Sequence, residues 1–119
     1  MPDRGRGRPG IQESAELRRL RMRIDALDRR IVALLNERAE LAREAGRAKQ
    51  AAGRRAIRDP QREREVLLRV TIANDGPLPQ AELLSLYRRL FAVTRALETR
   101  DRDRARTTIE IEPGGDDVD

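Results

Sequence analysis

The chain has 119 residues, the size of a single domain, and it carries a formal net charge of +5 with 25 Arg and one Lys as its basic residues. It contains no cysteine and no histidine, which excludes disulfides, thiol nucleophiles, imidazole acid–base chemistry and the usual zinc ligands. No apolar run approaches the ~20 residues that span a bilayer, and no apolar stretch follows the N-terminal arginines. We therefore expect a cytoplasmic protein with no membrane partner.

The charge is distributed unevenly along the chain. Residues 1–13 carry three Arg and two acids, and residues 105–119 carry one Arg and five acids, so that residues 14–104 hold a net charge of +8. A basic body of this kind favours an anionic partner, such as nucleic acid, phosphate or a polycarboxylate. Both ends offer little to bury. We therefore predict disordered tails at residues 1–13 and 105–119, the second one acidic, around one helical domain at residues 14–104.

The first helical pattern runs from about Ser14, a residue suited to an N-cap, to about Ala52. A helix of this length is about 57 Å long, whereas a compact domain of this size has a radius of gyration of only about 13 Å. The later helices are too short to cover it, so we expect an all-α, intertwined homodimer with three helices per chain. Apolar residues recur along its face at alternating intervals of three and four: Leu17, Leu20, Ile24, Leu27, Ile31, Leu34, Leu41, Ala45 and Ala48.

The second helix is predicted to begin at Asp59, an N-cap followed by proline at the first helical position, and to end near residues 74–77. The third is predicted to run from about Pro79 to about Arg104. Tyr87 and Phe91 are assigned to the core. The predicted apolar faces consist of Val66, Leu67 and Val70 on the second helix, and of Leu83, Leu86 or Tyr87, Leu90, Thr94 and Leu97 on the third.

Polar residues interrupt these faces or lie in the first turn of a helix. Arg38 lies in the apolar stripe of the first helix, and Lys49, eleven residues later, points in almost the same direction. A buried unpaired charge costs several kcal/mol. Such residues therefore form either an ion-pair network with side chains that reach water, or a cation-lined pocket for an anion. The other polar residues of this kind are Arg62 and Glu63 on the second helix and Thr94 and Glu98 on the third.

These residues belong to a longer pattern. The stretch LRRLRMRIDALDRRIVALLNERAELAREAGRAK, followed by IRDPQRERE, resembles the all-helical, type II chorismate mutases. In that family a long first helix carries Arg and an ERxxLAxxxGxxK segment, and RDxxRE opens the second helix. The resemblance covers roughly residues 14–100. It implies an isomerase that converts chorismate to prephenate in aromatic amino-acid biosynthesis, with no cofactor and no metal. Because the rearrangement is unimolecular and pericyclic, the lack of Cys and His costs it nothing.

The resemblance also implies a role for each matching residue. Arg38 and Lys49 would hold a substrate carboxylate, and Lys49 and Glu98 would hydrogen-bond the breaking ether oxygen. Glu63 would accept a hydrogen bond from the ring hydroxyl. Supporting contacts to the carboxylate and the ring would come from Arg62, from the backbone of Asp59 and from Thr94.

Arg21 matches an arginine that the family supplies across a dimer. It precedes Arg38 by seventeen residues, which is about 25 Å along a helix. Arg21 therefore cannot share a pocket with Arg38 and Lys49 of its own chain, but in an antiparallel helix pair it can reach the pocket of the partner. We expect a homodimer with shared sites for a small dicarboxylate substrate.

One residue departs from the common pattern of the family. Glu98 stands where many bacterial members carry Gln, and an ionised carboxylate cannot donate a hydrogen bond to an ether oxygen.

Three alternatives to a chorismate mutase stay open at this point. A mutase acting on 4-amino-4-deoxychorismate and an isochorismate pyruvate lyase share the fold, and Glu63 could accept from a ring hydroxyl or a ring ammonium. The more remote alternative is a basic helical dimer that binds nucleic acid. The recognisable basic-region, zinc-finger and aromatic RNA-binding signatures are missing, so we expect no nucleic-acid partner.

Overall fold

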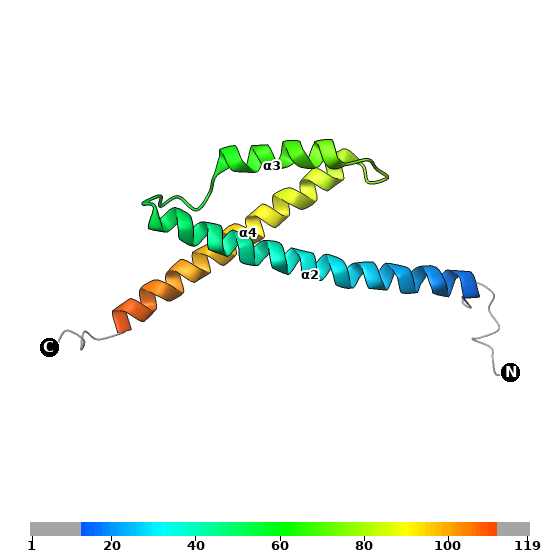
Figure 1. Cartoon of the computed structure of the whole chain (residues 1–119), viewed down its shortest axis with the longest axis horizontal. Helices are drawn as coiled ribbons and strands as arrows, with labels where there is room; N and C mark the ends of the chain where they lie inside the picture. The colour runs from blue at the N-terminus through cyan, green and yellow to red at the C-terminus, as the bar shows by residue number, and fades with distance from the viewer. Residues whose placement is uncertain (1–12, 112–119) are drawn as a thin grey trace. The chain divides into compact units, whose positions relative to one another are not determined.

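The computed structural model describes residues 13–111, and every regular element in that range is a helix. Helix α2 spans Ala15–Ala51, α3 spans Pro60–Ala73 and α4 spans Gln80–Ile111 (Figure 1). The chain divides into two compact units, the first ending at Arg38 and the second beginning at Ala39. The long helix α2 passes through both. The prediction of an all-α chain with one very long first helix is confirmed.

Both ends of α2 follow local rules. The Ser14 Oγ accepts a hydrogen bond from the Leu17 backbone N–H at 3.0 Å, which satisfies one of the donors that a first helical turn leaves free. After Ala51 the chain turns through Gly53, whose φ of +87° lies in the left-handed region. Glycine adopts that conformation without the steric cost that a Cβ would impose.

The apolar stripe of α2 is exposed in the single chain. Leu27 and Ile31 each expose 50% of their surface, and Leu41 exposes 59%. A continuous stripe of this kind is typical of a surface that another chain covers. Within residues 13–111, none of the helices carries the sustained apolar stretch that a bilayer-crossing segment needs. The other large exposed members of the stripe are Leu17, Leu20, Ile24 and Leu34.

Helix α3 is capped as the sequence predicts. The Asp59 Oδ1 accepts a hydrogen bond from the Arg62 backbone N–H at 3.1 Å, and Pro60 occupies the first helical position, where its missing N–H has no cost. At the other end, the Asn74 side-chain amide donates to the Leu78 carbonyl at 3.1 Å and to Gln80 at 2.9 Å. These bonds hold the short turn from which α4 leads back along α3, and the two helices pack together.

The buried core of the second unit is small. Phe91 is 6% exposed, which confirms its assignment to the core. Its ring meets that of the half-buried Tyr87 edge to face, with ring centroids 6.3 Å apart. Leu86 is 61% exposed, so Tyr87 rather than Leu86 continues the stripe of α4. Among residues 13–108, the other buried positions are Gly46 and Glu98. The half-buried members of the predicted stripe are Leu83, Leu90, Thr94 and Leu97.

Helix α4 continues to Ile111, beyond the predicted end at Arg104. The predicted start of a disordered tail at residue 105 is therefore wrong for residues 105–111. Their sequence, ARTTIEI, contains neither glycine nor proline, and the first residue that cannot continue a helix is Pro113. The remaining tail residues, 1–12 and 112–119, lie outside the described part of the chain.

Candidate active site

The predicted site residues are divided between the two units. Arg21 and Arg38 belong to the first unit, and all the others belong to the second. Arg21 is exposed and forms an ion pair with Glu13, and Arg38 is half-buried. Lys49 is also half-buried. The residues of the second unit are Lys49, Asp59, Arg62, Glu63, Thr94 and Glu98.

Glu98 is 8% exposed, and it lies directly against Gly46 of α2. A Cβ built at residue 46 would lie 3.2 Å from the Glu98 Cδ and 3.5 Å from its Cγ, and closer still to its Oε2. A side chain at residue 46 would therefore displace the carboxylate. Because Gly46 has none, α4 can place Glu98 against the backbone of α2 one turn before Lys49.

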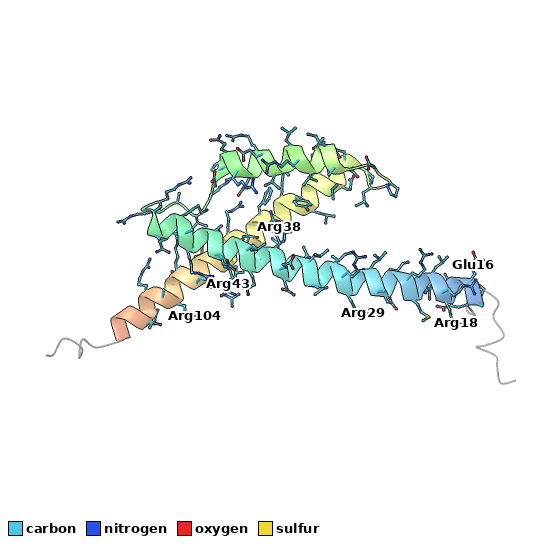
Figure 2. All side chains as sticks on the ribbon, in the orientation of Figure 1. Glu16, Arg18, Arg29, Arg38, Arg43 and Arg104 are labelled. Atoms are coloured by element: carbon cyan, nitrogen blue, oxygen red, sulfur yellow. The ribbon has the colours of Figure 1, made fainter. Side chains whose placement is uncertain are left out.

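A bidentate ion pair joins α2 to α4 beside this contact. The Nε and Nη2 of Arg43, which is labelled in Figure 2, donate to the two carboxylate oxygens of Asp101 at 2.8 and 2.9 Å. Two parallel charge-assisted bonds fix orientation as well as distance. Asp101 follows Glu98 by three residues, and Arg43 precedes Gly46 by three. The pair therefore holds the two helices where Glu98 meets Gly46.

The ion pair also predicts how stability depends on pH. The hydrogen bond from Arg43 holds the pKa of Asp101 below its ordinary value of 3.8. A carboxylate with a lowered folded-state pKa stabilises the fold above the unfolded value, and this contribution is lost as pH falls through the folded value. We expect Asp101→Asn to lower the Tm slightly, by an amount that is constant above about pH 5.5 and shrinks below about pH 4.

The matched control is Asp103→Asn. Asp103 is exposed, and its i,i+3 ion pair with Arg106 is a long one, with an N–O distance of 3.9 Å. It should leave the Tm nearly unchanged at every pH. A Tm difference for Asp101→Asn that stays constant or grows toward acid pH would contradict the role assigned to the pair.

Glu63 is engaged at both carboxylate oxygens. The Arg95 Nη1 pairs with Oε2, and the Arg58 Nε lies 3.7 Å from Oε1. The Glu63 side chain is 18% exposed and that of Arg95 30%, so this pair between α3 and α4 is partly removed from water. Sequence reasoning missed Arg95, because 32 residues separate it from Glu63 and no local spacing connects them.

Two other predicted residues serve the start of α3. The Asp59 carboxylate caps the helix, and one of its oxygens lies 3.7 Å from the Arg54 Nη2. Arg62 is directed to the surface, where its Nη1 lies 3.6 Å from Glu65. In the single chain the side chains of Asp59 and Arg62 therefore have partners of their own.

The remaining predicted residues are not joined to one another. The Thr94 Oγ1 donates to the Leu90 carbonyl at 2.9 Å, within its own helix. Within the described chain, neither Lys49 nor Glu98 takes part in an ion pair. The structure thus places a buried carboxylate and a half-buried ammonium on facing helices without neutralising either one.

A pocket of about 410 Å³ opens where residues 43–50 of α2 face residues 98–108 of α4. Of the predicted site residues, only Glu98 lines it. Lys49 is not among its lining residues. Its basic lining consists of Arg43, Arg47, Arg102 and Arg104.

The family of the chain follows from comparison with known proteins. Residues 20–99 match the family described as Chorismate mutase type II. The chain belongs to that family. The resemblance seen in the sequence is confirmed, and so is the all-helical fold that it implies.

The curated relatives that match are longer enzymes. The bifunctional chorismate mutase/prephenate dehydratase of Stutzerimonas stutzeri is 39% identical over 92 residues, covering 74% of this chain and 25% of that protein. The corresponding enzyme of Aquifex aeolicus is 39% identical over 87 residues, covering 70% of this chain and 24% of that protein. The chain thus spans about a quarter of the length of these relatives.

One solved structure is matched over almost its whole length. The chorismate mutase (form II) of Thermus thermophilus is 35% identical, with a TM-score of 0.67, over 71% of this chain and 96% of that chain. Form I of the same protein is 34% identical with a TM-score of 0.63, over 66% of this chain and 98% of that chain.

Proposed function

We propose that this chain catalyses the rearrangement of chorismate to prephenate, the step that leads to phenylalanine and tyrosine. The observation that carries the proposal is the family match over residues 20–99, which includes all the predicted site residues. The reaction is unimolecular and needs no proton transfer or covalent intermediate. The side chains have to hold the dianion in its reactive conformation and stabilise the negative charge that grows on the ether oxygen.

In this proposal Lys49 and Glu98 face the ether oxygen. Burial of Glu98 against Gly46, one turn from Lys49, supports the assignment, because a donor in a water-poor place acts more strongly on developing charge than one in bulk water. Arg38, with Arg21 of a second copy, would hold the carboxylates.

Glu63 would accept the hydrogen bond of the ring hydroxyl. Its carboxylate has about four acceptor positions, so the contacts with Arg95 and Arg58 leave room for one more donor. The supporting positions are Asp59, Arg62 and Thr94. For Thr94 to donate to a substrate carboxylate, its hydroxyl must give up the hydrogen bond that it donates to the Leu90 carbonyl.

We further propose that the working form is an intertwined homodimer with shared sites. The exposed apolar stripe of α2 supports it, with Leu27 and Ile31 each half exposed in the single chain. So does the small core, since a fold with few buried side chains cannot offset the conformational entropy of its residues. A cytoplasmic location and the lack of a nucleic-acid or membrane partner stay predictions.

The experiment that tests the function is a direct assay of purified protein against three substrates. Disappearance of chorismate with formation of prephenate is the expected result. Preferred conversion of 4-amino-4-deoxychorismate, or release of pyruvate from isochorismate, would replace the proposal with one of the two related activities. Steeply salt-dependent binding of duplex DNA without any turnover would favour the nucleic-acid alternative.

Gly46→Ala is expected to separate activity from stability. The added methyl displaces the Glu98 carboxylate, which is the end of a flexible side chain, so the backbone need not move. Alanine also gains up to about 1 kcal/mol over glycine in a helix. We expect kcat/KM for chorismate to fall by at least about tenfold while the Tm changes little.

The control is Ala33→Gly, the reverse exchange at an exposed position of α2 outside the apolar stripe. It should lower the Tm by the helix-propensity cost and leave kcat/KM unchanged. Full activity in Gly46→Ala would show that the contact with Gly46 does not position Glu98.

A further inference from the structure

The ion pair between Glu63 and Arg95 carries an inference about substrate choice, which rests on the proposed function. Glu63 would meet the ring substituent that distinguishes chorismate, which has a hydroxyl, from 4-amino-4-deoxychorismate, which has an amine that is protonated near neutral pH. A free carboxylate would accept from either group. The carboxylate of Glu63 is not free, because Arg95 pairs with one oxygen and the Arg58 Nε lies 3.7 Å from the other.

The charges at this point exceed what Glu63 can neutralise. One carboxylate faces two guanidinium groups, which leaves a local net charge of +1. The Arg95 side chain is 30% exposed and that of Arg58 is 65% exposed, so water screens Arg58 more strongly. Arg95 therefore dominates the field that a ring substituent would meet when it approaches Glu63.

A hydroxyl and an ammonium respond differently to that field. The hydroxyl is neutral, and it donates one hydrogen bond to a lone pair that the ion pairs leave available. The ammonium would have to share an already compensated carboxylate and would come within a few ångströms of a second cation. Like charges at such a distance in a partly desolvated site repel strongly.

We propose that Arg95 is a specificity-determining residue that makes the Glu63 end of the site accept a ring hydroxyl and reject a ring ammonium. It does so by holding Glu63 in an ion pair between α3 and α4 and by adding a positive charge that disfavours a cationic substituent. This is selection by repulsion of the wrong substrate as well as by binding of the right one.

The test compares kcat/KM for the two substrates in four proteins: wild type, Arg95→Leu, Arg95→Lys and the control Arg88→Leu. Arg88 lies two turns before Arg95 on α4 and is exposed. The readout is the ratio of kcat/KM for 4-amino-4-deoxychorismate to kcat/KM for chorismate. Because each ratio is measured within one protein, it does not depend on the folded fraction.

We expect Arg95→Leu to raise this ratio by about tenfold, and Arg95→Lys and Arg88→Leu to leave it within about twofold of wild type. The lysine variant keeps the charge, so it also separates the effect of charge from that of side-chain volume. A ratio that is unchanged or lower in Arg95→Leu, in an enzyme that converts chorismate, would overturn this inference alone. A wild-type protein that converts neither substrate would instead overturn the proposed function, and the inference with it.

Discussion

Replacement of Glu98 by alanine is expected to lower kcat/KM for chorismate by about 10²–10³ relative to a wild type whose Glu98 carboxyl is protonated, the usual cost of losing one donor to a developing oxyanion. The side chain is 8% exposed and packs on Gly46, so bulk water cannot easily take its place. Only a protonated carboxyl can donate to the ether oxygen, whereas the ionised form repels the growing negative charge. A wild type that uses this carboxyl as the donor therefore loses kcat/KM wherever the carboxyl is ionised.

Glu98→Gln tests the role of the carboxyl proton while the shape of the side chain stays the same. The amide has nearly the same size and donates an N–H bond at every pH. We expect its profile to be flat, with a rate equal to or above that of the wild type on the alkaline side. The measurement is kcat/KM of the two proteins from about pH 4.5 to 8.5.

A matched control for this comparison is Glu82→Gln, the same exchange at an exposed position in the first turn of α4. Its profile should follow that of the wild type. Parallel profiles for wild type and Glu98→Gln would show that Glu98 is not the donor to the ether oxygen.

The second large effect concerns sites shared between two chains. Arg21 and Arg38 lie on the same helix α2, about 25 Å apart at the rise of an α-helix, so one pocket cannot take both from one chain. The homodimers Arg21→Ala and Arg38→Ala should each be nearly inactive. Every mixed dimer should contain one site with both arginines and one with neither.

Mixing the two inactive variants in equal amounts, with unfolding and refolding, should therefore restore about a quarter of wild-type activity. Formation of mixed dimers is checked by mass spectrometry of differently tagged chains. Mixing Arg21→Ala with differently tagged Arg21→Ala is the control and should restore nothing. Mixed dimers that form and stay inactive would contradict shared sites, and an active Arg21→Ala homodimer would remove Arg21 from the site.

The helices could be predicted because their determinants are local. Ser14 and Asp59 cap the helices that follow them, within three residues of their hydrogen-bond partners. The one clear error, the end of α4, came from assigning the acidic charge of residues 105–119 to a tail. The seven residues after Arg104 contain no helix breaker, and local composition decided in favour of the helix.

Only part of the candidate site could be predicted from the sequence. Charged residues at apolar positions of a helical stripe identified Lys49 and Glu98, because the 3.6-residue period assigns a face to every position. The same period says nothing about which residue of another helix each one meets. Gly46 is part of the motif of the first helix, but its contact with Glu98 became visible only in the fold.

The sequence by itself determined the all-helical class, the caps, the exposed apolar stripe of α2 and the family, because each depends on spacings of a few residues or on a continuous motif. Only the tertiary structure decided that Arg43 pairs with Asp101 and Arg95 with Glu63, across 58 and 32 residues of chain. Such pairs depend on the rotation and offset of one helix against another, which are set by ridges packing into grooves over whole helix faces. No interval along a single helix contains that information.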